Sequence, residues 1–80
     1  SGVPTDIEEA PVMINERVVS VLVRLKMVAS GKEATRLIEQ GGIRLNDAPV
    51  TDLHATVSAD MLPAVLQVGK RKFVRLVVQS

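Results

Sequence analysis

The sequence predicts a small α+β domain in which a two-helix hairpin packs on a small, mainly antiparallel sheet. Three observations predict this fold class. Apolar residues recur at helical spacing over 16–28, a helix start signal and a glycine pair bound 30–42, and two apolar strands flank a basic turn over 64–79. With 80 residues the chain can form one compact core, but not a large substrate cleft in addition.

The N-terminal segment 1–15 is expected to be an acidic flexible linker, and 16–80 the folded domain. Pro4 and Pro11 interrupt this segment, although Thr5 with Glu8 could cap a brief helical turn. The first 16 residues contain four carboxylates and no base, whereas the remainder has ten basic against five acidic residues. A basic domain favours a polyanionic partner, nucleic acid first, and the alternative is an ordinary mixed surface.

The segment 16–28 is predicted to be the first helix, because its apolar residues recur three or four positions apart. Its valines favour a strand instead, but about a dozen residues without Gly or Pro suit a helix better. A second helix is expected to begin at Ser30, since Ser30 and Glu33 form a capping-box pattern. It is expected to end at Gly41-Gly42, where a glycine can adopt the left-handed cap conformation.

The second half of the chain is expected to form strands. Residues 43–45 alternate as a short strand with Arg44 outward, and 46–49 form a turn. Residues 51–63 are expected to be a loop-rich connection with at most a short helical or strand piece. Residues 64–68 and 72–79 then form a hairpin around a basic turn.

The composition argues against chemistry within this chain. It has no Cys and a single His, so neither a thiolate metal site nor a histidine zinc cluster can form. His54 is interpreted as an exposed loop residue and Ser30 as a helix cap, not a nucleophile. We therefore expect no catalytic residue, metal or cofactor here. No apolar run is long enough to span a bilayer and no signal peptide is visible, so we expect a cytoplasmic chain. The Ser1-Gly2 start suggests a piece of a larger protein.

The candidate binding residues are cationic. They fall in two groups, Lys32, Arg36 and Arg44 in one and Lys70, Arg71 and Lys72 with Arg75 in the other. If the strand after Gly42 pairs with the final hairpin, both groups could line one groove; the alternative is that each is a solvated surface. Phe73 is interpreted as a core residue in preference to a base-stacking platform.

The helical segment resembles the core motif of the S4 (S-four) RNA-binding domain, through Ser30, Glu33-Ala34, Arg36-Leu37-Ile38, Gln40-Gly41-Gly42, Ile43 and Leu45-Asn46. The final hairpin, 68–76, looks like the form of this domain found at the C-terminus of bacterial and organellar tyrosyl-tRNA synthetases. The lead-in Gly2-Val3-Pro4, Asp6-Ile7 and Pro11 is similar to the linker of those enzymes. Two departures reduce the charge of the helix face: Gly31 follows the capping serine, and Thr35 precedes Arg36.

The resemblance implies binding without catalysis. The domain would bind tyrosine tRNA near its long variable arm and anticodon stem, while ATP-dependent tyrosine activation occurs in a separate catalytic domain through which the parent dimerises. The fragment itself would be monomeric. The residues implied to bind RNA are Lys32, Arg36, Arg44, Lys70, Arg71 and Lys72, and those implied to cap the helix are Ser30, Glu33 and Gly41.

Two alternatives stay open at this point. The same domain also occurs in pseudouridine synthases and other RNA-modifying enzymes. A different class is a protein-interaction module that docks through the apolar strand 73–78. A small hydrolase is a remote third, because no catalytic constellation is present.

Overall fold

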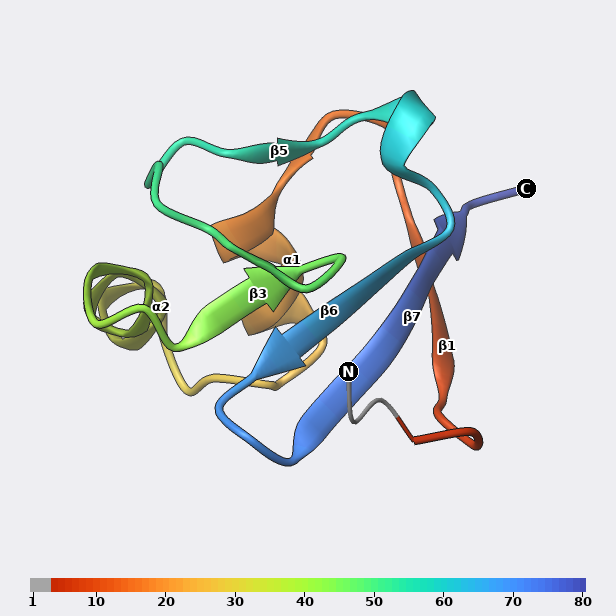
Figure 1. Ribbon diagram of the computed structural model, residues 1–80. Coiled ribbons are helices and arrows are strands. Elements are labelled where there is room, and N and C mark those ends of the chain that lie inside the picture. The colour runs from red at the N-terminus through yellow and green to blue at the C-terminus, as the bar shows by residue number, and fades with distance from the viewer. Residues whose placement is uncertain (1–3) are drawn as a thin grey trace.

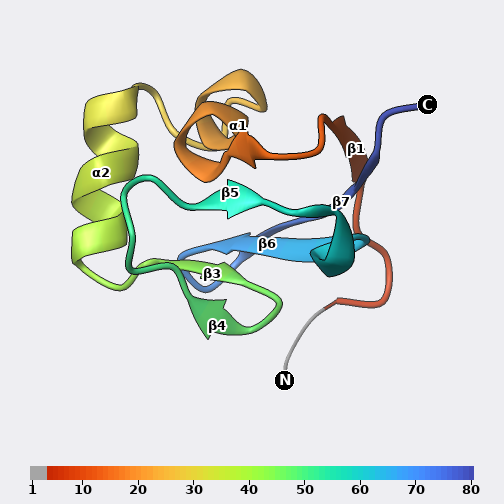
Figure 2. The same ribbon diagram turned by 90° about the horizontal axis from the view of Figure 1, so that it is seen from above.

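The computed structural model describes residues 4–80 and has two layers (Figures 1 and 2). Helices α1 (Val18–Arg24) and α2 (Gly31–Glu39) lie side by side and cover one face of a five-stranded sheet. The strand order is β1-β7-β6-β3-β4, and every neighbouring pair is antiparallel except β1 with β7. The prediction of an α+β domain with a helix pair on a mainly antiparallel sheet is confirmed.

The strands of this sheet are short at its edges and long at its centre. They are β1 (Glu9–Val12), β3 (Ile43–Leu45), β4 (Ala48–Pro49), β6 (Ala64–Val68) and β7 (Lys72–Val78). A second, two-stranded sheet pairs β2 (Glu16–Arg17) with β5 (Thr56–Val57), and η1 (Ala59–Met61) is a 3₁₀ turn before β6. The loop-rich connection expected over 51–63 therefore contains one short strand and one short helical turn.

Strand alternation places one apolar set beneath the helices. Ile43, Leu66 and Leu76 are fully buried, and they belong to one core with Leu22 of α1 and Ile38 of α2. Among the described residues no polar or charged side chain is buried. The opposite sheet face has the intervening residues of each strand and is open to solvent in part. One continuous apolar layer between helices and sheet therefore holds the domain together.

The segment expected to be a flexible linker enters the sheet. Residues 9–12 form β1, which runs parallel to β7 and pairs Ala10 with Leu76. Ala10 and Val12 are buried, while Glu9 and Pro11 are exposed. The linker prediction was wrong for this stretch, because two small apolar residues at alternate positions suffice for a strand when a partner edge is available. Residues 1–3 of the expected linker lie outside the described residues.

The first helix is shorter than predicted. Residues 16–17 belong to β2 and the helix ends at Arg24, not Val28. Lys26 has φ +58°, its N–H donates to the Val23 carbonyl (3.0 Å), and the Met27 N–H donates to the Leu22 carbonyl (2.9 Å). These two bonds form a Schellman motif, which stops the helix although no glycine marks the position.

The second helix has the predicted caps, with one difference. The Glu33 N–H donates to Ser30 Oγ (3.2 Å), which confirms the N-cap, but the Glu33 carboxylate accepts from the Ala29 N–H (2.7 Å) instead of the Ser30 N–H. Gly41 has φ +75°, and the Gly42 N–H donates to the Leu37 carbonyl (2.8 Å), so the predicted glycine cap is confirmed.

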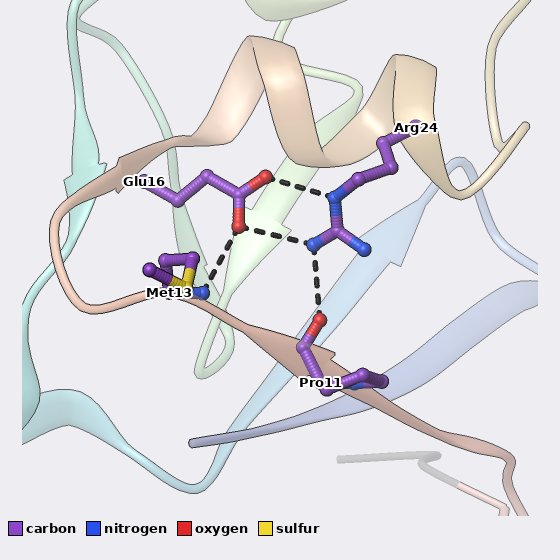
Figure 3. Close-up of polar contacts among 4 residues, drawn as sticks. All are labelled: Pro11, Met13, Glu16 and Arg24. Carbon is purple, nitrogen blue, oxygen red and sulfur yellow. Dashed lines mark hydrogen bonds and ion pairs between the residues drawn. The ribbon is translucent and has the colours of Figure 1, made fainter. Parts of the chain in front are cut away.

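A cluster centred on Arg24 holds the N-terminal strand against α1 (Figure 3). Arg24 donates from Nε to Glu16 Oε2 (2.9 Å) and from Nη2 to Glu16 Oε1 (3.0 Å) and to the Pro11 carbonyl (2.9 Å). Glu16 Oε1 also accepts from the Met13 N–H (3.1 Å). The Arg24 guanidinium holds the pKa of Glu16 below its ordinary value, against the opposing effect of partial burial, and the Met13 N–H adds to the lowering. The carboxylate therefore stabilises the fold in its ionised form.

Replacing Glu16 with Gln tests this cluster. We expect the free energy of unfolding at pH 7 to fall by about 1 kcal/mol, since a charge-assisted pair becomes neutral. Because the pKa of Glu16 is lowered in the folded state, its contribution is present above the unfolded-state pKa and is lost as the pH falls through the folded-state pKa. Urea unfolding at pH 7 and at progressively lower pH should therefore show the difference shrinking. The matched control is Glu39→Gln, at an exposed carboxylate of α2, which should change stability little.

Candidate nucleic-acid interface

The ten basic residues divide into three groups by the partners that the fold gives them. Four arginines have a carboxylate partner: Arg24 with Glu16 (2.9 Å), Arg36 with Glu33 (3.7 Å), Arg44 with Asp47 (4.0 Å) and Arg75 with Glu9 (4.0 Å). Arg17 donates to the Leu53 carbonyl (3.0 Å) and lies 3.3 Å from His54 Nδ1. The other five cations have neither an ion pair nor a side-chain hydrogen bond among residues 4–80, and we call them unpaired: Lys26, Lys32, Lys70, Arg71 and Lys72.

These five cations lie on three segments that meet at one end of the molecule. Figures 1 and 2 show the α1–α2 loop, α2 and the β6–β7 turn at the same end. The Gly69 N–H of that turn donates to the Gly42 carbonyl (2.8 Å), directly after α2, and Ile43 pairs with Val68. The strand after Gly42 thus pairs with the final hairpin, which is the condition under which the two groups could come together. The backbone fixes the hairpin tip beside the C-terminal end of α2.

Shallow hollows connect the segments. One hollow of about 460 Å³ lies beside residues 72–74 of β7, the part of that strand that β1 does not pair with. The cations that line it are Lys26, Arg71 and Lys72. The other wall of this hollow is formed by the segment that precedes β1, including Asp6 and Glu8. A second hollow is lined by Lys26, Lys72 and Glu33, and a third, over the outer face of α2, by Lys32, Glu33 and Arg36. Glu33 is common to the last two, so the hairpin side and the α2 face form adjoining surfaces.

Arg36 and Lys32 lie where the sequence predicted, on the exposed side of α2. The Arg36 side chain is 58% exposed and its carboxylate neighbour is Glu33, one turn back. An ion pair this exposed is worth only a few tenths of a kcal/mol, so the guanidinium can exchange the carboxylate for another anion. Both side chains are therefore available to a ligand.

Arg44 does not join this group. Strand alternation buries Ile43 and Leu45 beneath the helices and puts Arg44 on the opposite sheet face. Its guanidinium donates to the Asp47 carbonyl (3.1 Å) in the β3–β4 turn. The structure thus brings together the α2 and hairpin residues but leaves Arg44 on another surface.

Phe73 is not part of the core. Val74 and Leu76 occupy the buried face of β7, so the alternation turns Phe73 to the other face, where it is half-buried and lines the 460 Å³ hollow. The core interpretation was wrong. Its partly exposed ring borders the hollow that Arg71 and Lys72 also line.

Comparison with known proteins identifies the fold. Residues 16–62, which include α1, α2 and β3, match the S4 domain. The chain belongs to the S4 domain family. The β6–β7 hairpin and β1 lie outside this match, but the relatives described next extend over them.

Tyrosine–tRNA ligases contain this S4 domain in their C-terminal region. The chain is 40% identical to the ligase of Mycoplasma pneumoniae over 73 residues, 91% of this chain and 18% of that protein. It is 42% identical to the ligase of Cereibacter sphaeroides over 76 residues, which are 88% of this chain and 18% of that protein. It is 36% identical to the ligase of Nitrosospira multiformis over 80 residues, which are 96% of this chain and 20% of that protein. The chain thus spans about a fifth of the length of these relatives, which fits a non-catalytic part of such a ligase.

Two further observations concern other classes of site in the S4 domain. The described residues contain no group of three or more His, Asp or Glu side chains that could hold a metal ion. Neither described helix has the length and apolar character needed to cross a bilayer. His54 is exposed in a loop, as expected, and its backbone N–H donates to Asp52 Oδ1 (2.8 Å).

Lys26 is the cation that sequence reasoning missed. The sequence predicts Lys26 within the first helix, whereas the structure places it in the α1–α2 loop, exposed, on the border of two hollows. No glycine or proline signals the end of α1, so the sequence offered no local indication that Lys26 leaves the helix. It stands beside the hairpin cations only because of tertiary packing.

Replacing Ser30 with Ala tests the cap that begins α2. Loss of the Oγ acceptor leaves the Glu33 N–H without its partner, and we expect the free energy of unfolding to fall by about 1 kcal/mol. Ser20→Ala is the matched control, since Ser20 is exposed within α1 and the change raises helix propensity. Equal stabilities of the Ser30→Ala variant and wild type in urea unfolding would contradict the capping role.

Proposed function

We propose that this S4 domain binds RNA through phosphate contacts, and that its partner is tyrosine tRNA, near the long variable arm and anticodon stem. The observation that supports this most directly is the gathering of five unpaired cations at the end where α2, the α1–α2 loop and the β6–β7 turn meet. Lysine and arginine bind phosphate oxygens and release condensed counterions, which gives affinity for a nucleic-acid backbone. The similarity to tyrosine–tRNA ligases supports tRNA as the particular partner.

The chemistry of the surface favours recognition of shape. Phe73 is the one aromatic residue, so stacking on several bases is not possible. Four of the five cations sit on α2 or on the β6–β7 hairpin, whose tip is bonded to the end of α2, and Lys26 sits on the α1–α2 loop. Such an arrangement reads the spacing of phosphates in a folded RNA more than its base sequence.

In the parent enzyme the domain acts by local concentration. The proposed parent is a cytoplasmic tyrosine–tRNA ligase in which ATP-dependent tyrosine activation, and dimerisation, belong to a separate catalytic domain. A tRNA held by the S4 domain has a raised effective concentration at that distant site. The isolated domain itself needs only weak affinity and acts as a monomer.

The rival proposal of a protein-interaction module has less support. That proposal uses residues 73–78 as a free strand edge, but β7 lies between β6 and β1, and β1 pairs with residues 75–78. Its backbone groups there are already bonded within the sheet. An RNA-modifying parent such as a pseudouridine synthase remains the second candidate for the same RNA-binding domain.

A fluorescence anisotropy titration with tyrosine tRNA tests the proposal. We expect tighter binding to the intact tRNA than to one with a shortened variable arm. The affinity should fall with salt at a log–log slope on the order of −3 to −5, as four to six phosphate contacts require. Salt-sensitive binding that ignores the arm would indicate another RNA target. Binding that survives added salt, or no binding at low salt, would refute phosphate capture.

Replacing Arg36 with Ala tests the α2 face. We expect binding of tyrosine tRNA to weaken about fivefold, since one charge-assisted contact of about 1 kcal/mol is lost, and the fold to remain intact because the side chain is exposed. Glu39→Gln on the same helix is the control, because removing a negative charge there should leave affinity equal or tighter. Equal affinity of the Arg36→Ala variant and wild type would remove Arg36 from the interface.

A further inference from the structure

The backbone of Lys26 is unusual for a lysine. Four residues other than glycine have positive φ in the described chain, and three of them are Asn15, Asn46 and Asp47, types that tolerate the left-handed region. Lys26, at φ +58°, is the exception. It occupies the position after the α1 C-cap that glycine fills in the equivalent motif of α2, at Gly41. A lysine there is strained, because its Cβ crowds the backbone in the left-handed region, whereas glycine has no Cβ.

Local packing does not account for this lysine. The side chain is exposed, and no hydrogen bond or ion pair joins its ammonium to any group of residues 4–80. The two backbone bonds that end α1 use the N–H groups of Lys26 and Met27, and these form equally well with glycine. A positive charge near the C-terminus of α1 is stabilised by the helix dipole. An experiment must therefore distinguish a role of Lys26 in stability from a role in binding.

The side chain has a defined setting at the interface. Lys26 lines the 460 Å³ hollow together with Arg71 and Lys72, and the neighbouring hollow together with Lys72. Lys26 thus places a positive charge of the α1–α2 loop beside those of the β6–β7 hairpin, although the two segments are far apart in sequence. Asp6 and Glu8 line the opposite wall, and neither forms an ion pair with these cations. The three positive groups therefore stay available to an anion.

We propose that Lys26, Arg71 and Lys72 form one phosphodiester-binding site, and that Lys26 keeps its strained conformation because this conformation serves binding. The inference rests on the proposed RNA function and goes beyond it, since it assigns a residue of the α1–α2 loop and a particular hollow to the backbone of the RNA. Three cations that line one hollow suit a single phosphate group, whose two unesterified oxygens can accept hydrogen bonds from an ammonium and a guanidinium together.

Lys26→Gly separates binding from stability, because the two change in opposite directions. Relief of the left-handed strain should leave the midpoint of thermal unfolding equal or higher. Affinity for tyrosine tRNA should fall about fivefold, with the salt slope reduced in magnitude by about 1. Lys26→Arg keeps the charge and should retain most of the affinity. A Lys26→Gly protein that binds as tightly as wild type, with the same salt slope, overturns the proposal, as does one that only loses stability.

A double-mutant cycle then tests whether the cations share one phosphate. We expect Lys26→Gly and Lys72→Ala together to weaken binding by less than the product of their separate effects, since the second change removes a charge from a site already lost. The control cycle pairs Lys26→Gly with Lys32→Ala, on α2, and should be multiplicative. Multiplicative effects in both cycles would overturn the shared site. Absence of any tRNA binding by wild type would instead refute the proposed function, so the two failures are distinguishable.

Discussion

The hydrogen bond from the Gly69 N–H to the Gly42 carbonyl (2.8 Å) fixes the geometry on which the candidate interface depends. It joins Gly42, which follows the glycine cap of α2, to Gly69, the first residue of the β6–β7 turn. Gly41 and Gly69 both have positive φ. No Cβ at those two positions would meet another atom within 4 Å, so their glycines are required by backbone conformation and not by space. Main-chain bonds therefore set the distance between the end of α2 and the hairpin tip, and this distance does not change when the long cationic side chains move.

The parts of the fold that local signals determine could be predicted from the sequence. Ser30 and Glu33 begin α2, Gly41 ends it, and alternating apolar residues with a glycine between them give the β6–β7 hairpin. What could not be predicted depends on distant partners. Strand β1 exists because the edge of β7 accepts it in a parallel register, and nothing within an acidic, proline-containing segment indicates that pairing. The early end of α1 depends on a lysine in a conformation that sequence rules reserve for glycine.

The candidate site shows the same division. Sequence alone could find the basic residues but could not tell which of them are already paired. Arg24 and Lys26 are two residues apart, yet Arg24 bonds to Glu16 and Pro11 and holds β1 against α1, whereas Lys26 has no such partner in the described chain. Arg44 is close to the α2 cations in sequence, but strand alternation puts its side chain on the other face of the sheet. Folding thus divides chemically similar residues into those that stabilise the domain and those left for a ligand.

The two outermost strands of the sheet each contain a proline, Pro11 in β1 and Pro49 in β4. Proline lacks the N–H that an incoming strand would need, and both strands are short. Between them lies β7, seven residues long and ending in Leu76, Val77 and Val78, which is the segment of this sheet best suited to self-association. β1 therefore covers the edge of β7: while its four residues stay paired, the sheet of a neighbouring molecule cannot extend along that edge.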